Sequence, residues 1–263
     1  MFYSHFSLDQ NPFMECPPLA WLQKDERFDQ GLARLEYFAR EGLAALLLGN
    51  TGTGKSSLLR LFKQHLDKNR CPVQYLHLTH LTAPGMLRLI VAELGEEPKL
   101  GKDRLFRQIL QCVNKSETPT MLLLDEAHLL PPDALTDLRL LLGSFTEQTS
   151  KLKIVLCGQQ PLRLMLNRQA HEDLAARIAV RYRLAPLNEE QTHAYIKARM
   201  KNAGASKDIF QDDARDAIHE YAQGNPRQIN NIATACLINA AIKNESIITE
   251  ISVNQAMNEF RLP

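Results

Sequence analysis

One eight-residue segment limits the folds open to this chain more than any other feature. Residues 49–56 read Gly-Asn-Thr-Gly-Thr-Gly-Lys-Ser and match G-x-x-x-x-G-K-[ST] at every fixed position. An apolar run, 43–48, precedes the segment, and a stretch with helical spacing follows it. Glycines let successive N–H groups point at one oxyanion, and the N-terminus of a helix adds partial positive charge. The segment therefore predicts a phosphate-binding loop between a buried strand and a helix.

The residue types in this loop predict a nucleoside triphosphate site with Mg²⁺. Lys55 is expected to reach the β- and γ-phosphates, and Ser56 to ligate the metal ion. The full set of expected nucleotide-binding residues here is Gly49, Asn50, Thr51, Gly52, Thr53, Gly54, Lys55, Ser56 and Ser57.

Short apolar runs alternate with longer amphipathic stretches from residue 43 to residue 186. This alternation is typical of parallel strands in a sheet that helices cover on both faces. After Pro186 the pattern predicts helices only. We therefore expect a leader over 1–30 that packs on the protein, an α/β domain over 31–186 and a small all-helical domain over 187–263. Strands are expected at 43–48, 73–78, 120–124, 153–157 and 180–184, and helices at 28–41, 55–68, 84–95, 103–114, 132–145, 161–169, 188–203, 211–223, 226–243 and 252–260.

Two acids directly follow the apolar run Met121–Leu124. A strand that ends in carboxylates places them at the edge of a parallel sheet where ligands bind. Asp125 is expected to hold Mg²⁺, and Glu126 to orient and deprotonate the attacking water. An isolated acid pair of this kind is equally typical of a helix N-cap, but the upstream phosphate loop favours the catalytic interpretation. The adjacent acid favours hydrolysis by water over phosphoryl transfer to a metabolite.

Three further polar residues are candidates for the same site. Gln159 follows an apolar run and reaches the γ-phosphate or the water if its strand lies between the other two; otherwise it is a turn glutamine. Arg177 is a candidate finger for the γ-phosphate of a neighbouring copy, with Arg181 as its alternative, unless these arginines form a surface basic strip. Arg227 lies in the first turn of an expected helix, where the dipole disfavours a cation, so it indicates a facing anion or is an ordinary exposed arginine.

Composition excludes several classes of protein. With 31 basic and 30 acidic residues the net charge is +1, so the chain is no strongly basic nucleic-acid coat, although a local basic surface remains possible. Its five scattered cysteines form no C-x-x-C pair, which argues against a zinc site and favours reduced thiols in the cytoplasm. The apolar runs are far shorter than the roughly 20 residues of a membrane span, and the start is no signal peptide.

Taken together, these motifs resemble those of the AAA+ ATPases. The leader segment Phe6–Phe13 is also similar to the F-x-L-x-x-N-P-F start of ExeA-like ATPases, a group similar to the TniB/TnsC-type transposition ATPases and the phage Mu B protein. The resemblance implies ATP and Mg²⁺ as cofactors and names Gln159 as sensor 1, Arg177 as the trans finger and Arg227 as sensor 2. It also implies that Asn11, Pro12 and Phe13 pack near the adenine. A finger in trans implies a homo-oligomer, ring or filament.

The resemblance leaves three functions open. The first is a transposition regulator that assembles on duplex DNA with ATP and acts with a partner transposase. The second is an ExeA-like ATPase of secretion or envelope assembly that acts through protein partners, and the third is a signalling or defence switch. ExeA-like secretion proteins continue into a membrane segment and a peptidoglycan-binding region; if this sequence is the whole product, the expectation is a cytoplasmic transposition protein with no membrane contact.

A basic stretch supplies the candidate DNA contacts, which are Arg88, Lys102, Arg104 and Arg107. Three of them lie at the start of one expected helix, in a region that the resemblance places along the central channel of an assembly. The alternative is an ordinary solvated helix face. Because aromatic residues do not interleave with these cations, contact with the DNA backbone is expected, without sequence preference.

Overall fold

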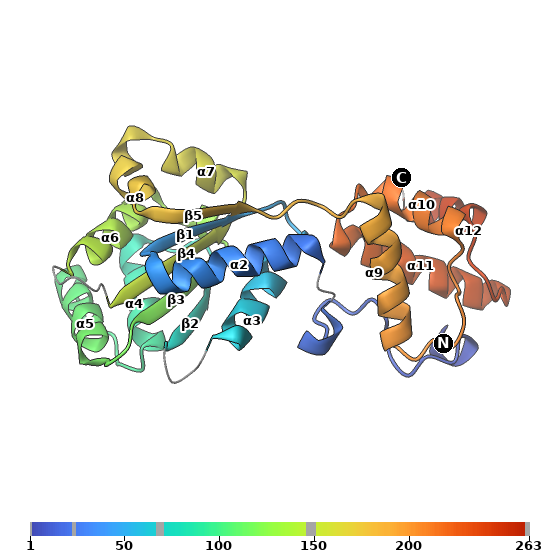
Figure 1. Ribbon diagram of the computed structural model, residues 1–263, viewed down its shortest axis with the longest axis horizontal. Helices are drawn as coiled ribbons and strands as arrows, with labels where there is room; N and C mark the ends of the chain where they lie inside the picture. The colour runs from blue at the N-terminus through green and yellow to red at the C-terminus, as the bar shows by residue number, and fades with distance from the viewer. Residues whose placement is uncertain (1, 23–24, 67–70, 146–150, 261–263) are drawn as a thin grey trace. The chain divides into compact units, whose positions relative to one another are not determined.

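The computed structural model describes residues 2–22, 25–66, 71–145 and 151–260 (Figure 1). The chain forms two compact units. The larger unit comprises Glu26–Thr51 and Lys55–Leu184, and the helical unit comprises Met1–Asp25, Gly52–Gly54 and Ala185–Pro263. The divisions at residues 25/26 and 184/185 lie beside the domain boundaries expected at 30 and 186.

A five-stranded sheet, parallel throughout, forms the centre of the larger unit in the order β2-β3-β4-β1-β5 (Figure 1). Every strand expected from the sequence is present, so the predicted fold class is confirmed. The strand that precedes Gln159, β4, lies between the phosphate-loop strand β1 and the acid strand β3, which is the order that the interpretation of Gln159 requires. The strands are β1 Ala44–Leu48, β2 Val73–His77, β3 Thr120–Asp125, β4 Leu152–Gly158 and β5 Ile178–Arg183.

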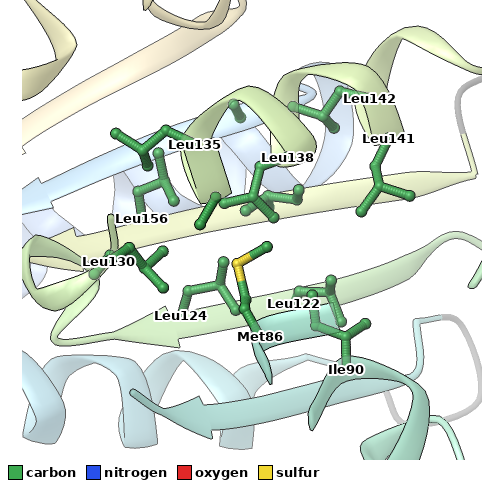
Figure 2. Close-up of a cluster of buried hydrophobic side chains, with 14 of the residues drawn as sticks. Met86, Ile90, Leu122, Leu124, Leu130, Leu135, Leu138, Leu141, Leu142 and Leu156 are labelled. Carbon is green, nitrogen blue, oxygen red and sulfur yellow. The ribbon is translucent and has the colours of Figure 1, made fainter. Parts of the chain in front are cut away.

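The three inner strands β1, β3 and β4 are buried along their whole length because helices cover both faces of the sheet. On β3 and β4, alternate side chains such as Leu122 and Leu156 enter a cluster with the helices α4 (Ala83–Glu93) and α6 (Pro132–Gly143), shown in Figure 2. The helix α5 (Lys102–Lys115) adds side chains to the same cluster. The intervening residues, such as Leu123, are equally buried and face the opposite way. On that opposite face α2 (Glu26–Glu41) packs against β1, β5 and α3 (Lys55–His65). The continuous apolar runs seen in the sequence are therefore the signature of a doubly covered sheet.

The helices of the larger unit begin and end close to where the apolar periodicity predicts. Thr82 caps α4 by accepting a hydrogen bond from the Gly85 amide. The short helix α8 and the 3-10 turns η2 and η3 were not expected, because three to five residues are too few to show a helical period. The elements are α2 Glu26–Glu41, α3 Lys55–His65, α4 Ala83–Glu93, α5 Lys102–Lys115, η2 Ala127–Leu129, α6 Pro132–Gly143, α7 Gln160–Leu166, η3 Gln169–His171 and α8 Glu172–Ala176.

In the helical unit, local sequence signals fix where the helices start. Asn188 forms a reciprocal capping box with Gln191, and Asn225 caps the helix that begins at Pro226. Gly224 before that cap has φ +67°, and an added Cβ would lie 1.9 Å from the Leu187 carbonyl oxygen, so only glycine fits. The elements are α1 Phe2–His5, η1 Leu19–Trp21, α9 Glu189–Asn202, α10 Asp212–Ala222, α11 Pro226–Lys243 and α12 Glu250–Phe260.

The leader belongs to the core of the helical unit. Its apolar side chains, Phe2, Phe6, Leu8 and Phe13, are buried in one cluster with α9, α10 and α11. Arg199 of α9 is almost fully buried, donates to the Met14 carbonyl at 2.7 Å, and faces the rings of Trp21 and Tyr195 at 5.8 and 5.6 Å. Burial lowers the pKa of this guanidinium. Aromatic contacts and a carbonyl thus hold the leader to α9.

Candidate active site

The phosphate loop joins β1 to α3 as the sequence predicts. Gly52 and Gly54 have φ of +81° and +103°, conformations that favour glycine and turn the backbone amides inward. Lys55 is the first residue of α3 and only 4 % exposed, and its Nζ donates to the Asn50 carbonyl at 3.1 Å. Within the described residues no carboxylate lies at ion-pair distance from it. A buried ammonium that lacks a counter-charge suits an anionic ligand.

The acid strand ends in a buried and well-bonded carboxylate. Oδ2 of Asp125 accepts hydrogen bonds from the Ser56 hydroxyl and the Tyr75 hydroxyl, each at 2.6 Å, and Oδ1 accepts from the Glu126 amide at 2.9 Å. Burial opposes ionisation, but the hydrogen bonds from Ser56, Tyr75, Cys157 and the Glu126 amide hold the pKa of Asp125 below its ordinary value. The group is therefore ionised at neutral pH.

These contacts test whether the site suits Mg²⁺. An ionised carboxylate and a serine hydroxyl whose oxygens lie 2.6 Å apart are the hard oxygen donors that this ion prefers. The residues present thus fit the metal ion that the sequence predicts for Ser56 and Asp125.

Glu126 has an unusual backbone. Its φ of +57° and ψ of +32° lie in the left-handed region, which a glutamate rarely adopts. Residues held this way concentrate at functional sites. The turn separates the two acids, since Asp125 points into the buried hydrogen-bond network while the Glu126 side chain remains 23 % exposed. Asp125 is thus ionised and held in place by hydrogen bonds, whereas the Glu126 side chain is accessible to water.

Gln159 and Glu126 meet through a third side chain, His128. Gln159 precedes α7 at the end of β4, and its Nε2 lies 3.0 Å from Nε2 of His128. Nδ1 of the same imidazole lies 3.2 Å from a carboxylate oxygen of Glu126. The structure therefore places two of the predicted residues on opposite sides of one ring.

Tyr75 and His128 were missed by the sequence analysis. Tyr75 lies on β2, which pairs with β3, and a tyrosine near the end of the neighbouring strand was the available signal. His128 follows the acid pair by two residues, but the tight turn that brings it back toward Glu126 leaves no periodic trace in the sequence.

Arg177 and Arg181 of the larger unit form no hydrogen bond with Asp125, Glu126, His128 or Gln159 among the described residues. Arg177 is partly exposed and follows α8, and the Arg181 guanidinium donates to the Ala175 carbonyl at 2.9 Å. Arg227 is in the helical unit, where its Nη2 lies 3.4 Å from a carboxylate oxygen of Glu15. The trans-finger and sensor roles of these residues stay predictions.

The residues expected near the adenine have structural roles in the helical unit. The Asn11 side chain accepts from the Phe13 amide at 2.9 Å, and the Phe13 ring packs edge-on against Phe210 in the core. Pro12 is buried as well. Their expected place beside the adenine stays a prediction.

The four DNA candidates divide into two kinds. Arg88, Arg104 and Arg107 are exposed on α4 and α5, and within the described residues they form no ion pair. Lys102 instead lies 2.8 Å from a carboxylate oxygen of Asp137, a side chain on α6 that is only 3 % exposed. Lys102 thus neutralises a buried charge where α5 begins.

The parallel sheet, the phosphate loop and the acidic strand end together give the chain the fold and the nucleotide site of an AAA+ P-loop ATPase, a site that suits ATP and Mg²⁺. Residues 39–166 match the family described as AAA domain. The chain is also 32 % identical over 265 residues to General secretion pathway protein A of Aeromonas hydrophila. That alignment covers 98 % of this chain but 48 % of the relative, so the chain spans about half the length of that protein.

Solved structures show the same fold at low sequence identity. The Cdc6p protein of Pyrobaculum aerophilum is similar with a TM-score of 0.76 and 20 % identity, over 96 % of this chain and 71 % of that one. The Orc1 protein of Aeropyrum pernix in complex with DNA is similar with a TM-score of 0.72 and 18 % identity, over 90 % and 66 % of the two chains. The expected fold, ATPase activity and cofactors are confirmed, and the secretion relative supports the likeness to ExeA-like ATPases.

Proposed function

We propose that this ATPase assembles on duplex DNA as a homo-oligomer, ring or filament, and regulates transposition or target-site selection with a partner transposase. The observation that carries the DNA part is the set of exposed arginines on α4 and α5. The transposase part rests on the resemblance of the leader and of the nucleotide motifs. All five cysteines are free, which supports a cytoplasmic location.

The arginines differ from two lysines of α5 in having no acidic partner. Lys102 pairs with Asp137 and Lys115 with Glu96, whereas Arg88, Arg104 and Arg107 have no acid at ion-pair distance among the described residues. Arg104 and Arg107 are three residues apart on α5, and side chains at that spacing share one side of a helix. Arginine forks onto phosphate oxygens, and backbone phosphates dominate DNA affinity.

Two or three phosphate contacts in one subunit give weak binding. Assembly multiplies them, because each further subunit binds at high effective concentration once its neighbour is in place. An oligomer that forms with ATP would therefore couple nucleotide binding to DNA binding. The structurally similar Orc1 protein was solved in complex with DNA, which agrees with this use of the fold.

At the nucleotide site, each residue has one expected task. Lys55 binds the β- and γ-phosphates, Ser56 and Asp125 hold Mg²⁺, and Glu126 takes a proton from the attacking water. Mg²⁺, when bound, neutralises charge on the phosphates. Gln159 orients the γ-phosphate or the water, Arg227 faces the triphosphate, and Arg177 of a neighbouring copy completes the site.

The test is ATP-dependent DNA binding by Arg104→Ala/Arg107→Ala, with Arg40→Ala as the control. Arg40 is an exposed arginine in the last turn of α2, and its removal takes away one positive charge where the double variant loses two. With a slowly hydrolysed ATP analogue, we expect the double variant to bind random duplex DNA at least tenfold more weakly and with a smaller salt dependence. Equal affinity in the double variant and the control would overturn the assignment of this surface. Lys102 is left intact because Asp137 depends on it.

Secretion or envelope assembly through protein partners is the second candidate function, and the relative named General secretion pathway protein A favours it. The same experiment separates the two. ATP-driven assembly with no DNA affinity at low salt would support a protein partner. The α5 arginines would then be ordinary solvent-exposed residues with no DNA-binding role. A signalling or defence switch has no specific observation in its favour.

A further inference from the structure

His128 connects two residues that the ATPase mechanism uses separately. Its ring is 11 % exposed, with Gln159 at Nε2 and Glu126 at Nδ1. With the Gln159 amide as donor, Nε2 accepts, and the proton of the neutral ring lies on Nδ1. Nδ1 lies 3.2 Å from the Glu126 carboxylate without the alignment of a hydrogen bond, and it has no other partner among the described residues.

The surroundings hold the ring in this place. The turn η2 that contains His128 packs on the end of β4 and on α7. Gly158 leaves room for it, since an added Cβ there would lie 3.2 Å from the His128 amide nitrogen and 3.4 Å from Nδ1. The same Cβ would lie 2.9 Å from Leu162. The backbone therefore shapes a slot for this one imidazole between the two polar strand ends.

We propose that His128 is a positioning residue that holds the Glu126 carboxylate in register with Gln159. This inference rests on the proposed roles of Glu126 as base and Gln159 as the γ-phosphate or water contact. A buried N–H that faces a carboxylate attracts it electrostatically and limits its rotamers. Because the ring is anchored by Gln159 on its other side, a movement of Gln159 toward the γ-phosphate changes the position of Glu126. In this proposal the ring acts through Glu126 and Gln159 and has no contact of its own with the nucleotide.

The test separates turnover from nucleotide binding. We expect His128→Ala to lower kcat about tenfold with little change in nucleotide affinity, because no phosphate contact is lost. His128→Asn keeps an amide N–H near the place of Nδ1 and is expected to restore part of the rate. In a double-mutant cycle with Gln159→Ala, the two fold-losses in kcat should multiply to more than the loss of the double variant, because both substitutions act through the same ring. His65→Ala removes a surface histidine that pairs with Glu36 and serves as the control, with unchanged kcat.

Glu126→Gln distinguishes the failure of this inference from the failure of the active-site assignment. If Glu126→Gln hydrolyses ATP at the parental rate, the assignment of the base is wrong. If Glu126→Gln is inactive while His128→Ala keeps the parental kcat, only the positioning role is wrong. Fully additive losses for His128 and Gln159 would also overturn it. Should His128→Ala fail to fold, the cycle is run with His128→Asn, which retains a polar group of similar size.

Discussion

Two charged regions of the larger unit are built in opposite ways. At the end of β3, Asp125 is fully buried and accepts hydrogen bonds from Ser56, Tyr75, Cys157 and the Glu126 amide of its own chain. On α4 and α5, Arg88, Arg104 and Arg107 are exposed and have no acidic partner among the described residues. The hydrogen bonds of the first region all come from one chain.

The difference shows which charges the fold has already satisfied. Asp125 is in a low-dielectric setting, where losing one donor is costly, so its neighbours must be placed accurately. The exposed arginines cost little in the free protein and leave their charge available to an anion from outside. Arg177 is partly exposed and belongs to the second group. We therefore expect metal binding to need one chain only, and DNA binding and the arginine finger to need other molecules.

The largest expected effect is that of Arg177→Ala on hydrolysis by the assembled protein. A trans arginine finger contributes about 10³-fold or more to turnover, so hydrolysis should fall by about that factor while a single subunit still binds nucleotide. Phosphate release measures hydrolysis, and nucleotide titration at low protein concentration measures binding by the single subunit. Arg181→Ala is the comparison that settles the choice between the arginines. Loss of nucleotide binding by the isolated Arg177→Ala subunit would argue against a role in trans.

Glu126→Gln comes next. Loss of the general base should slow hydrolysis about a hundredfold or more while ATP stays bound, because Asp125, Ser56 and Lys55 are untouched. We expect longer-lived ATP-dependent assemblies as a consequence, which gel filtration can follow. A variant that binds no ATP would show that Glu126 has a structural role in the loop instead.

Lys102→Met tests the difference between a charge that is paired inside the fold and an exposed charge that has no acidic partner among the described residues. Removal of Lys102 leaves the buried Asp137 carboxylate without a counter-charge, so the free energy of unfolding should fall by about 2 kcal/mol, or about thirtyfold in the equilibrium constant. Arg107→Met, on the same helix, should change it by less than about 0.5 kcal/mol. Urea unfolding compares them. Equal stabilities would mean that the Lys102–Asp137 contact contributes nothing.

Tyr75→Phe has the smallest expected effect. It removes one hydroxyl donor to Asp125 and leaves Ser56 in place, so the half-saturating Mg²⁺ concentration for hydrolysis should change about threefold. The control is Tyr37→Phe on α2, where the side chain is 58 % exposed. A change in ATP affinity without any change in the Mg²⁺ dependence would contradict the placement of Tyr75 beside the metal ligands.

Most of the fold was predictable because its signals are local or periodic. The apolar runs gave all five strands, and the Gly224–Arg227 segment gave the end of one helix and the start of the next. Helix α8 was missed because it is shorter than two turns. The extent to which the leader joins the helical core could not be predicted, because the contacts of Phe13 with Phe210 and of Met14 with Arg199 join segments some 200 residues apart.

The candidate site was predictable where a motif specifies the chemistry. Lys55, Ser56, Asp125 and Glu126 follow from motifs, and the structure brings Ser56 to Asp125. His128 and Tyr75 depend on a left-handed turn and on the register between β2 and β3, which no single motif encodes. The sequence also did not show that the cations of α5 have different roles. Only the packing of α5 and α6 shows that Lys102 neutralises Asp137, whereas Arg104 and Arg107 stay exposed.

The most direct test of the central claim is electron microscopy and gel filtration of the protein with random-sequence duplex DNA, a slowly hydrolysed ATP analogue and two salt concentrations. We expect rings or filaments on DNA that require the nucleotide and dissociate as the salt concentration is raised. Assemblies that form with the nucleotide but do not bind DNA at either salt concentration would contradict the proposed assembly on DNA.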